Sequence, residues 1–231
     1  MMWIKKFAVF WICLTSFFGL FAAEIVSTNL PIFKCIEYQN GKGTCDFNDL
    51  DLNETHPYFK PVLESWNKFT NGEIYHMRIF GKSIAVLTND ICKHFPTINN
   101  YSASNLGIKA VHRDAFEACP NLKALDLSRN QLTSLASNIF YNDSKLEDFN
   151  LSGNQLKIIA GSLIKHTPKL KLLNLRSNRI MEFSIEDMPF LSNLETLDLR
   201  DNRLTDLNEN LFYGKFPALQ SGMAYYDRKF I

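Results

Sequence analysis

One pattern recurs four times at a fixed interval between residues 122 and 219, and it constrains this chain more than any other feature. Its first copy reads Leu-Lys-Ala-Leu-Asp-Leu-Ser-Arg-Asn-Gln-Leu. The copies begin at Leu122, Leu146, Leu170 and Leu194. Each contains an asparagine 24 residues from the next, at Asn130, Asn154, Asn178 and Asn202. A spacing kept this strictly indicates a repeat architecture.

The L-x-x-L-x-L-x-x-N-x-L form of each copy is the leucine-rich-repeat signature. Leu125 and Leu127 alternate with small or polar residues, as a short half-buried strand requires. Stacked copies would form a parallel sheet with strands about 4.8 Å apart. The asparagine amide has donors and an acceptor, so it can satisfy backbone groups of its own coil and of the neighbouring coil. We therefore predict an α/β solenoid with a curved parallel sheet on its concave side, short helical or irregular convex segments, and a disulfide-bonded N-terminal cap.

The pattern extends towards the N-terminus in weaker form. Copies starting at Ile74 and Ile98 keep the apolar places, but Lys82 and Leu106 replace the asparagine. We predict a signal peptide at 1–23, a cap with an irregular first coil at 24–73, about six coils at 74–219, and a tail at 220–231. Beyond residue 219 the pattern is lost, so the tail or a partner is expected to cover the last coil. An outer apolar core is predicted at Phe140, Ile164, Met188 and Phe212.

The first 23 residues have the features of a secretory signal peptide. Lys5 and Lys6 form a basic start, residues 7–21 are apolar, and Ala22 and Ala23 supply small residues for cleavage. A membrane anchor is the alternative, but the apolar run is shorter than the roughly 20 residues of a spanning helix. We therefore expect a secreted, extracellular protein with no membrane span in its mature chain.

The charge balance argues against two classes of partner. Removing the signal peptide takes two lysines from 25 basic residues and nothing from 24 acidic residues, so 23 − 24 leaves a net charge of −1. Nucleic acids and membrane surfaces both attract concentrated positive charge. We expect neither as a partner.

Four cysteines remain after the signal peptide, and an even number in a secreted chain suggests two disulfides. Cys35 and Cys45 flank a Gly-Lys-Gly turn, so they can close a small hairpin. Cys92 and Cys119 are 27 residues apart, which places them on the outer side of adjacent coils within reach of each other. We predict Cys35–Cys45 and Cys92–Cys119. A zinc site is the alternative, but the paired C-x-x-C spacing is missing.

The N-terminal half also resembles a narrower group, the secreted and ectodomain leucine-rich-repeat proteins of insects. The resemblance rests on the Cys35–Cys45 hairpin, on Ile-Cys-Lys-His-Phe-Pro at 91–96, and on Ala-Phe-Glu-Ala-Cys-Pro-Asn-Leu at 115–122. It covers most of residues 33–219. Similar proteins include the mosquito immune proteins that complex with complement-like thioester proteins, and Toll-type receptor ectodomains. The resemblance implies recognition of a protein or microbial ligand. The chain departs from the mosquito group at the C-terminus, which in that group continues through more cysteines into a coiled coil.

The sequence shows no convincing catalytic constellation. Its five histidines form no H-x-x-x-H pair, and there is no G-x-S-x-G elbow. The Gly-Lys-Gly-Thr segment at 41–44 lacks the spacing of a phosphate-binding loop. We expect no enzyme activity, no cofactor and no metal site.

A binding surface is predicted on the concave sheet, which solenoids commonly use for recognition. Glycan acceptor sequences (N-x-S/T) occur at Asn53, Asn100, Asn142 and Asn150. All but Asn142 are predicted to lie on this surface, where glycans would displace binding towards the C-terminal coils. There an exposed Leu172 beside Arg176 and Arg200 would combine an apolar anchor with bidentate donors. The predicted ligand-binding residues are Leu172, Asn174, Arg176, Thr196, Asp198 and Arg200.

These features favour a secreted, non-enzymatic recognition protein that binds an extracellular protein or a microbial surface, in innate immunity or another extracellular interaction. One alternative is an extracellular adhesion or developmental structural protein. Another is a truncated receptor-like decoy that forms homo- or hetero-oligomers through its C-terminal end.

Overall fold

The computed structural model describes residues 32–37, 42–48, 73–81, 83–141, 145–183, 188–205, 214–220 and 223–225. Backbone contacts divide the chain into Met1–Leu30 and Pro31–Ile231, and every described residue belongs to the second unit. The predicted signal peptide therefore lies outside the described residues.

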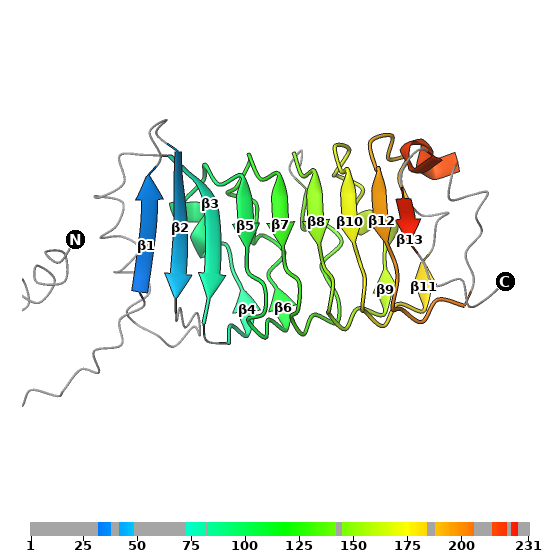
Figure 1. The fold of residues 1–231 in the computed structure, drawn as a ribbon, viewed down its shortest axis with the longest axis horizontal. Helices are drawn as coiled ribbons and strands as arrows, with labels where there is room; N and C mark the ends of the chain where they lie inside the picture. The colour runs from blue at the N-terminus through cyan, green and yellow to red at the C-terminus, as the bar shows by residue number, and fades with distance from the viewer. Residues whose placement is uncertain are drawn as a thin grey trace, which may run out of the picture. The chain divides into compact units, whose positions relative to one another are not determined.

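One long sheet runs through the described coils in chain order (Figure 1). All neighbouring strands are parallel, except for the first pair, which is antiparallel. The strands, in spatial order, are β1 (Ile32–Glu37), β2 (Lys42–Asn48), β3 (Glu73–Phe80), β5 (Asn100–Ser102), β7 (Ala124–Asp126), β8 (Asp148–Asn150), β10 (Leu172–Asn174), β12 (Thr196–Asp198) and β13 (Met223–Tyr225).

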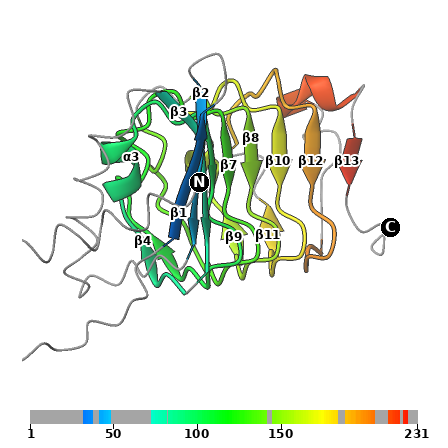
Figure 2. The same cartoon turned by 60° about the vertical axis from the view of Figure 1, so that its left-hand side comes forward.

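Each coil returns through short, mostly irregular segments. Two pairs of two-residue strands form there, namely β4 (Val86–Leu87) with β6 (Ala110–Val111), and β9 (Ile158–Ile159) with β11 (Glu182–Phe183). The helical elements among the described residues are short: α3 (Asp90–His94), η1 (Gly161–Leu163) and η2 (Pro217–Gln220). Figure 2 shows α3 set apart from the strands of the long sheet. The predicted leucine-rich-repeat solenoid is confirmed.

The core lies between the long sheet and the outer segments, where the repeat pattern predicted it. Leu125 and Leu127 of the first strong copy are buried, and so are the outer residues Phe140, Ile164 and Met188. Phe212 lies outside the described residues. A chain of aromatic contacts links neighbouring coils, with ring centroids 6.1 Å apart for Tyr101–Phe116, 6.0 Å for Phe116–Phe140 and 5.2 Å for Phe140–Phe149.

The asparagine ladder joins each coil to the one before it. Asn154 Oδ1 accepts the backbone N–H of Leu132 at 3.1 Å, and its Nδ2 donates to the carbonyls of Leu127 and Leu151 at 2.9 Å each. Leu151 belongs to the same coil as Asn154, whereas Leu127 and Leu132 belong to the preceding coil. Corresponding bonds to both coils are made by Asn130, Asn178 and Asn202.

The residue before each ladder position has a left-handed backbone. These residues are spaced by 24 and have φ values from 55° to 105°, at Gly81, Asn105, Arg129, Gly153, Ser177 and Asp201. Only glycine adopts this region without steric cost from a Cβ atom. The turn therefore requires a left-handed backbone at this place in every one of these coils, with a steric cost at the four residues that are not glycine, a feature that the leucine spacing did not reveal.

The disulfide between Cys92 and Cys119 is present, with Cα atoms 5.1 Å apart, and both residues are buried. For the other predicted pair, the register of β1 and β2 aligns Cys35 directly with Cys45. The side chains of these two residues lie outside the described part of the structure, so that bond stays a prediction.

The long sheet does not end at residue 219, where the solenoid was predicted to stop. Strand β13 pairs in parallel with β12 and aligns Met223 with Thr196 and Tyr225 with Asp198. The repeat pattern did not predict this strand, because Gly222 and Ala224 occupy the two positions where the pattern requires large apolar residues. Residues of the tail therefore pair with the last regular strand.

The ladder predicts the effect of removing one amide. Asn154→Ala should lower the free energy of unfolding by at least about 2 kcal/mol, because each buried backbone group that loses its partner costs about 1–3 kcal/mol. Urea denaturation followed by circular dichroism measures this loss. Gln155→Ala changes the neighbouring residue and should stay within about 0.5 kcal/mol of the parent. Equal losses for the two variants would contradict a specific role for the ladder.

The left-handed turn predicts a second effect on stability. Gly153 has φ +68°, so Gly153→Ala should cost about 1–2 kcal/mol through backbone strain alone. Gly214→Ala is the matched control, because an added Cβ there meets no described atom within 4 Å and no positive φ is involved. Thermal unfolding of the two variants should show a lowered midpoint for Gly153→Ala only; a similar shift in both would argue against strain.

Candidate functional site

The outward side chains of the long sheet, here called the sheet face, line up in rows because the strands are in register. The first row follows the N-terminal ends of the strands and the second row follows their C-terminal ends. The first row is His76, Asn100, Ala124, Asp148, Leu172 and Thr196, and the second is Arg78, Ser102, Asp126, Asn150, Asn174 and Asp198.

Four consecutive members of the second row are engaged in turns. A side-chain oxygen of each accepts the backbone N–H two residues further on, at 2.9 Å for Asp126 and 3.1 Å for Asn150, Asn174 and Asp198. Asn and Asp commonly stabilise chain reversals in this way. Sequence reasoning assigned Asn174 and Asp198 to ligand binding, and missed that an Asn or Asp recurring every 24 residues signals a structural turn.

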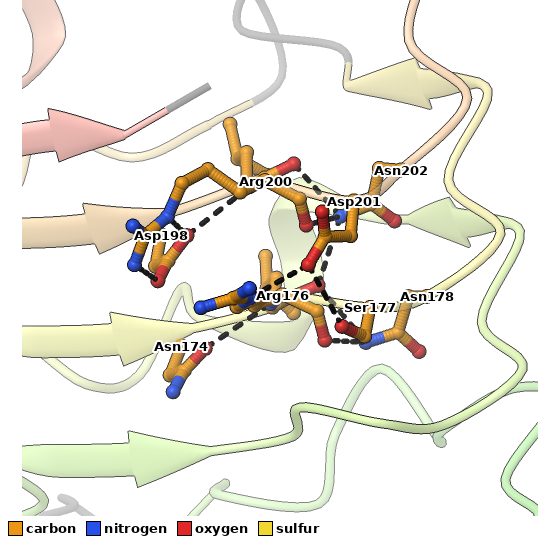
Figure 3. Close-up of polar contacts among 10 residues, drawn as sticks. Asn174, Arg176, Ser177, Asn178, Asp198, Arg200, Asp201 and Asn202 are labelled. Atoms are coloured by element: carbon orange, nitrogen blue, oxygen red, sulfur yellow. Dashed lines mark hydrogen bonds and ion pairs between the residues drawn. The ribbon is translucent and has the colours of Figure 1, made fainter. Parts of the chain in front are cut away.

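The two predicted arginines are held by carboxylates (Figure 3). Arg200 donates from Nε and from a terminal nitrogen to the two oxygens of Asp198, at 2.9 and 2.6 Å. Arg176 Nε donates to Asp201 Oδ2 at 2.7 Å, and Ser177 Oγ contacts the same oxygen at 3.2 Å. The Arg200–Asp198 pair lies at the C-terminal end of β12, whereas the Arg176–Asp201 pair connects adjacent coils.

These contacts shift the titration of one carboxyl group. The hydrogen bond from Arg176 lowers the pKa of Asp201 below its ordinary value of 3.8, and the Ser177 hydroxyl adds to this effect. Asp201 is solvent-exposed, so screening keeps the stabilisation small. The pair fixes the direction of the Arg176 side chain more than it stabilises the fold.

Leu172 is half-buried, so its prediction as an exposed aliphatic anchor was wrong. The register aligns it with Thr196 on one side and Asp148 on the other. Neighbouring side chains in the row cover part of a residue that the sequence treats as fully outward. Leu172 and Thr196 lie on β10 and β12, and the two arginines follow the C-terminal ends of the same two strands.

An open hollow of about 640 Å³ lies over β3, β5, β7 and β8 rather than over the C-terminal strands. Its floor contains Ala124, the smallest side chain of the first row, between Asn100 and Asp148. Asp126 and Asn150 also line it. No sequence signal other than the small residue at 124 could have located this hollow.

Two predicted glycan acceptors therefore line the same hollow. Asn100 is exposed, whereas Asn150 is half-buried and its Oδ1 also accepts the Ser152 hydroxyl at 2.8 Å. Asn53 and Asn142 lie outside the described residues. The structure brings Asn100 and Asn150 together but separates them from the C-terminal cluster of predicted ligand-binding residues.

The described residues contain no group of three or more His, Cys, Asp or Glu side chains that could hold a metal ion. They also contain no helix that is both long and apolar enough to cross a membrane.

Comparison with family models finds leucine-rich repeats in two regions. One model, described as leucine rich repeat, matches residues 103–156 and 120–180, and a second with the same description matches residues 193–214. Comparison with curated proteins finds no match.

Among solved structures, the LRIM1/APL1C complex matches with a TM-score of 0.53 and 21% identity, over 76% of this chain and 36% of that chain. The APL1 leucine-rich repeat domain matches with a TM-score of 0.51 and 22% identity, over 71% and 48%. The Toll–Spatzle complex of Drosophila has a TM-score of 0.47 and 20% identity, over 61% and 22%. The first two likenesses show the fold, and this chain spans less than half the length of the chains it matches.

The arginine contact predicts a pH effect. The pKa of Asp201 is lowered on folding, so its pairing stabilises the protein above the unfolded pKa, and this stabilisation is lost as pH falls through the folded pKa. NMR titration should therefore place the Asp201 pKa below 3.8, and Arg176→Gln should raise it. Arg179→Gln, which changes another exposed arginine of the same coil, should leave it in place. An Asp201 titration unchanged by Arg176→Gln would disprove the contact.

Proposed function

We propose that this protein is a secreted, non-enzymatic recognition protein that binds an extracellular protein or a microbial surface, in innate immunity or a related extracellular interaction. The repeat fold supports the proposal, because solenoids present an extended surface that commonly serves for binding. The similar LRIM1/APL1C structure is itself a complex, which is in keeping with this role for the fold. The signal-like N-terminus supports secretion.

The observation that carries the proposal is the fixed Arg176 on the C-terminal part of the sheet face. Its bond to Asp201 uses Nε, and a guanidinium has five N–H donors in all. Because the Arg176 side chain is already oriented, it loses less conformational entropy when a partner accepts its other hydrogens. Arginine is also enriched among the residues that dominate interface energies.

The binding site follows from this residue and its neighbours. Leu172 and Thr196 lie side by side in the first row and offer a partly covered apolar and hydroxyl surface on the two strands that the arginines follow. Arg200 and Asp198 form a salt bridge at the C-terminal end of β12. We assign recognition to Leu172, Arg176, Thr196 and Arg200, with Asn174 and Asp198 as the turn residues that position them.

The test uses the full chain, secreted from cultured cells and immobilised on a support. Sequencing of the mature N-terminus should place cleavage after Ala23. The immobilised protein should retain a specific protein or microbial component from the extracellular fluid of its source, and Arg176→Ala should reduce retention at least about fivefold, because truncation of an interface anchor costs more than 1 kcal/mol.

Arg113→Ala is the matched control for this experiment. Arg113 is also an exposed arginine, but it lies in the outer part of a coil, away from the sheet face. It should leave retention unchanged. Equal retention by the two variants would place binding elsewhere on the molecule, and a protein that remains inside the cell would contradict secretion.

A further inference from the structure

The hollow over Ala124 is a feature that recognition at the C-terminal coils does not use. Asn100, Ala124 and Asp148 stand in register on β5, β7 and β8, so Asn100 and Asp148 are separated by two strand spacings, or about 10 Å. Between them the alanine methyl group leaves a gap. The hollow of about 640 Å³ falls within the roughly 300–1,000 Å³ range of pockets that hold drug-sized ligands.

The lining suits a ligand rich in hydroxyl and amide groups. The exposed Asp148 carboxylate is an acceptor, and Asp126 uses one oxygen for the Ser128 N–H and has a second oxygen. Carboxylate acceptors make stronger hydrogen bonds than neutral ones. The chitobiose base of an N-linked glycan is a ligand of this kind and of drug-like size.

The acceptor sequence for such a glycan lies at the edge of the hollow. In Asn100-Tyr101-Ser102 the tyrosine is buried in the core, while Asn100 is exposed and lines the hollow with Ser102. On the other side of Asn100 in the row stands His76, a much larger side chain than Ala124. A group attached to Asn100 therefore finds the most room over the alanine.

We propose that the N-linked glycan of Asn100 lies in this hollow, over Ala124, with its hydroxyl groups donating to Asp148 and Asp126. The glycan closes the sheet face over β3 to β8 and leaves the C-terminal strands open. The inference depends on secretion, which is part of the proposed function. It deepens that function, because it explains why a partner binds at β10 and β12.

The attachment is a group transfer from a lipid-linked oligosaccharide diphosphate. The Asn100 amide nitrogen forms a bond to the anomeric carbon of the first sugar, the bond from that carbon to the diphosphate oxygen breaks, and the amide loses one proton. The diphosphate lipid leaves with the bonding electrons. No oxidation or reduction takes place.

The first measurement is glycopeptide mass spectrometry of the secreted full chain. A glycan on Asn100 is the expected result. An unmodified Asn100 alongside a modified Asn53 or Asn142 would overturn this inference and leave the proposed function intact. If none of the acceptor asparagines of the secreted protein carries a glycan, this inference fails as well, whereas the proposed function is judged by its own retention experiment.

The second measurement is a double-mutant cycle that asks where the glycan lies. Ser102→Ala removes the acceptor sequence but keeps Asn100. It should lower the thermal midpoint by about 2–4 °C, because a chain of this size shifts by that much when it loses the stabilisation of about one hydrogen bond. In the Asp148→Ala background the same change should have less than half that effect, because the effects of mutating two groups that contact each other do not add.

Two control variants complete the cycle. Asp148→Asn keeps an oxygen acceptor and should retain most of the Ser102→Ala effect. Ser144→Ala removes the acceptor sequence at Asn142 and should add independently to Asp148→Ala. A Ser102→Ala effect of the same size with and without Asp148 would show that the glycan points away from the hollow and would overturn the proposal.

Discussion

The asparagine ladder is the interaction on which the rest of the structure depends. A chain that bends sharply out of a sheet leaves buried N–H and C=O groups unpaired, and a single amide satisfies three of them across two coils. Because Asn154 bonds to both its own and the preceding coil, it sets the distance and register between them. The rows of the sheet face from β7 to β12, and therefore the candidate binding site, rely on that register being repeated from coil to coil.

Much of the fold could be predicted from the sequence because the pattern of leucines and asparagines reports burial and hydrogen bonding directly. The pairing of Cys92 with Cys119 followed from the same frame. The strand β13 could not be predicted, because Gly222 and Ala224 do not supply the apolar residues that the repeat pattern requires. The left-handed turn was missed because the residues that adopt it are as different as Gly153, Arg129 and Asp201.

The candidate site was less predictable than the fold. The sequence identified Arg176 and Arg200, but only the stacked coils show that Asp201 of the next coil bonds to Arg176. Half-burial of Leu172 depends on how side chains from adjacent strands pack, and the 24-residue spacing that identifies those neighbours does not give their packing. A hollow forms where side-chain volume is missing, so the small size of Ala124 indicates one only when its neighbours Asn100 and Asp148 are known.

The disulfide has a consequence for the order in which the structure opens. Cys92 and Cys119 join the coils whose ladder places hold Lys82 and Leu106, so a covalent link stands where the repeated amide is missing. Solenoid stability is a sum of contributions from coils and their nearest-neighbour interfaces. With the link reduced, we expect the interface between these two coils to have low local stability, so that amide hydrogens there exchange with solvent early. The redox state of the two cysteines would then decide whether the first of these coils unfolds together with the rest of the solenoid.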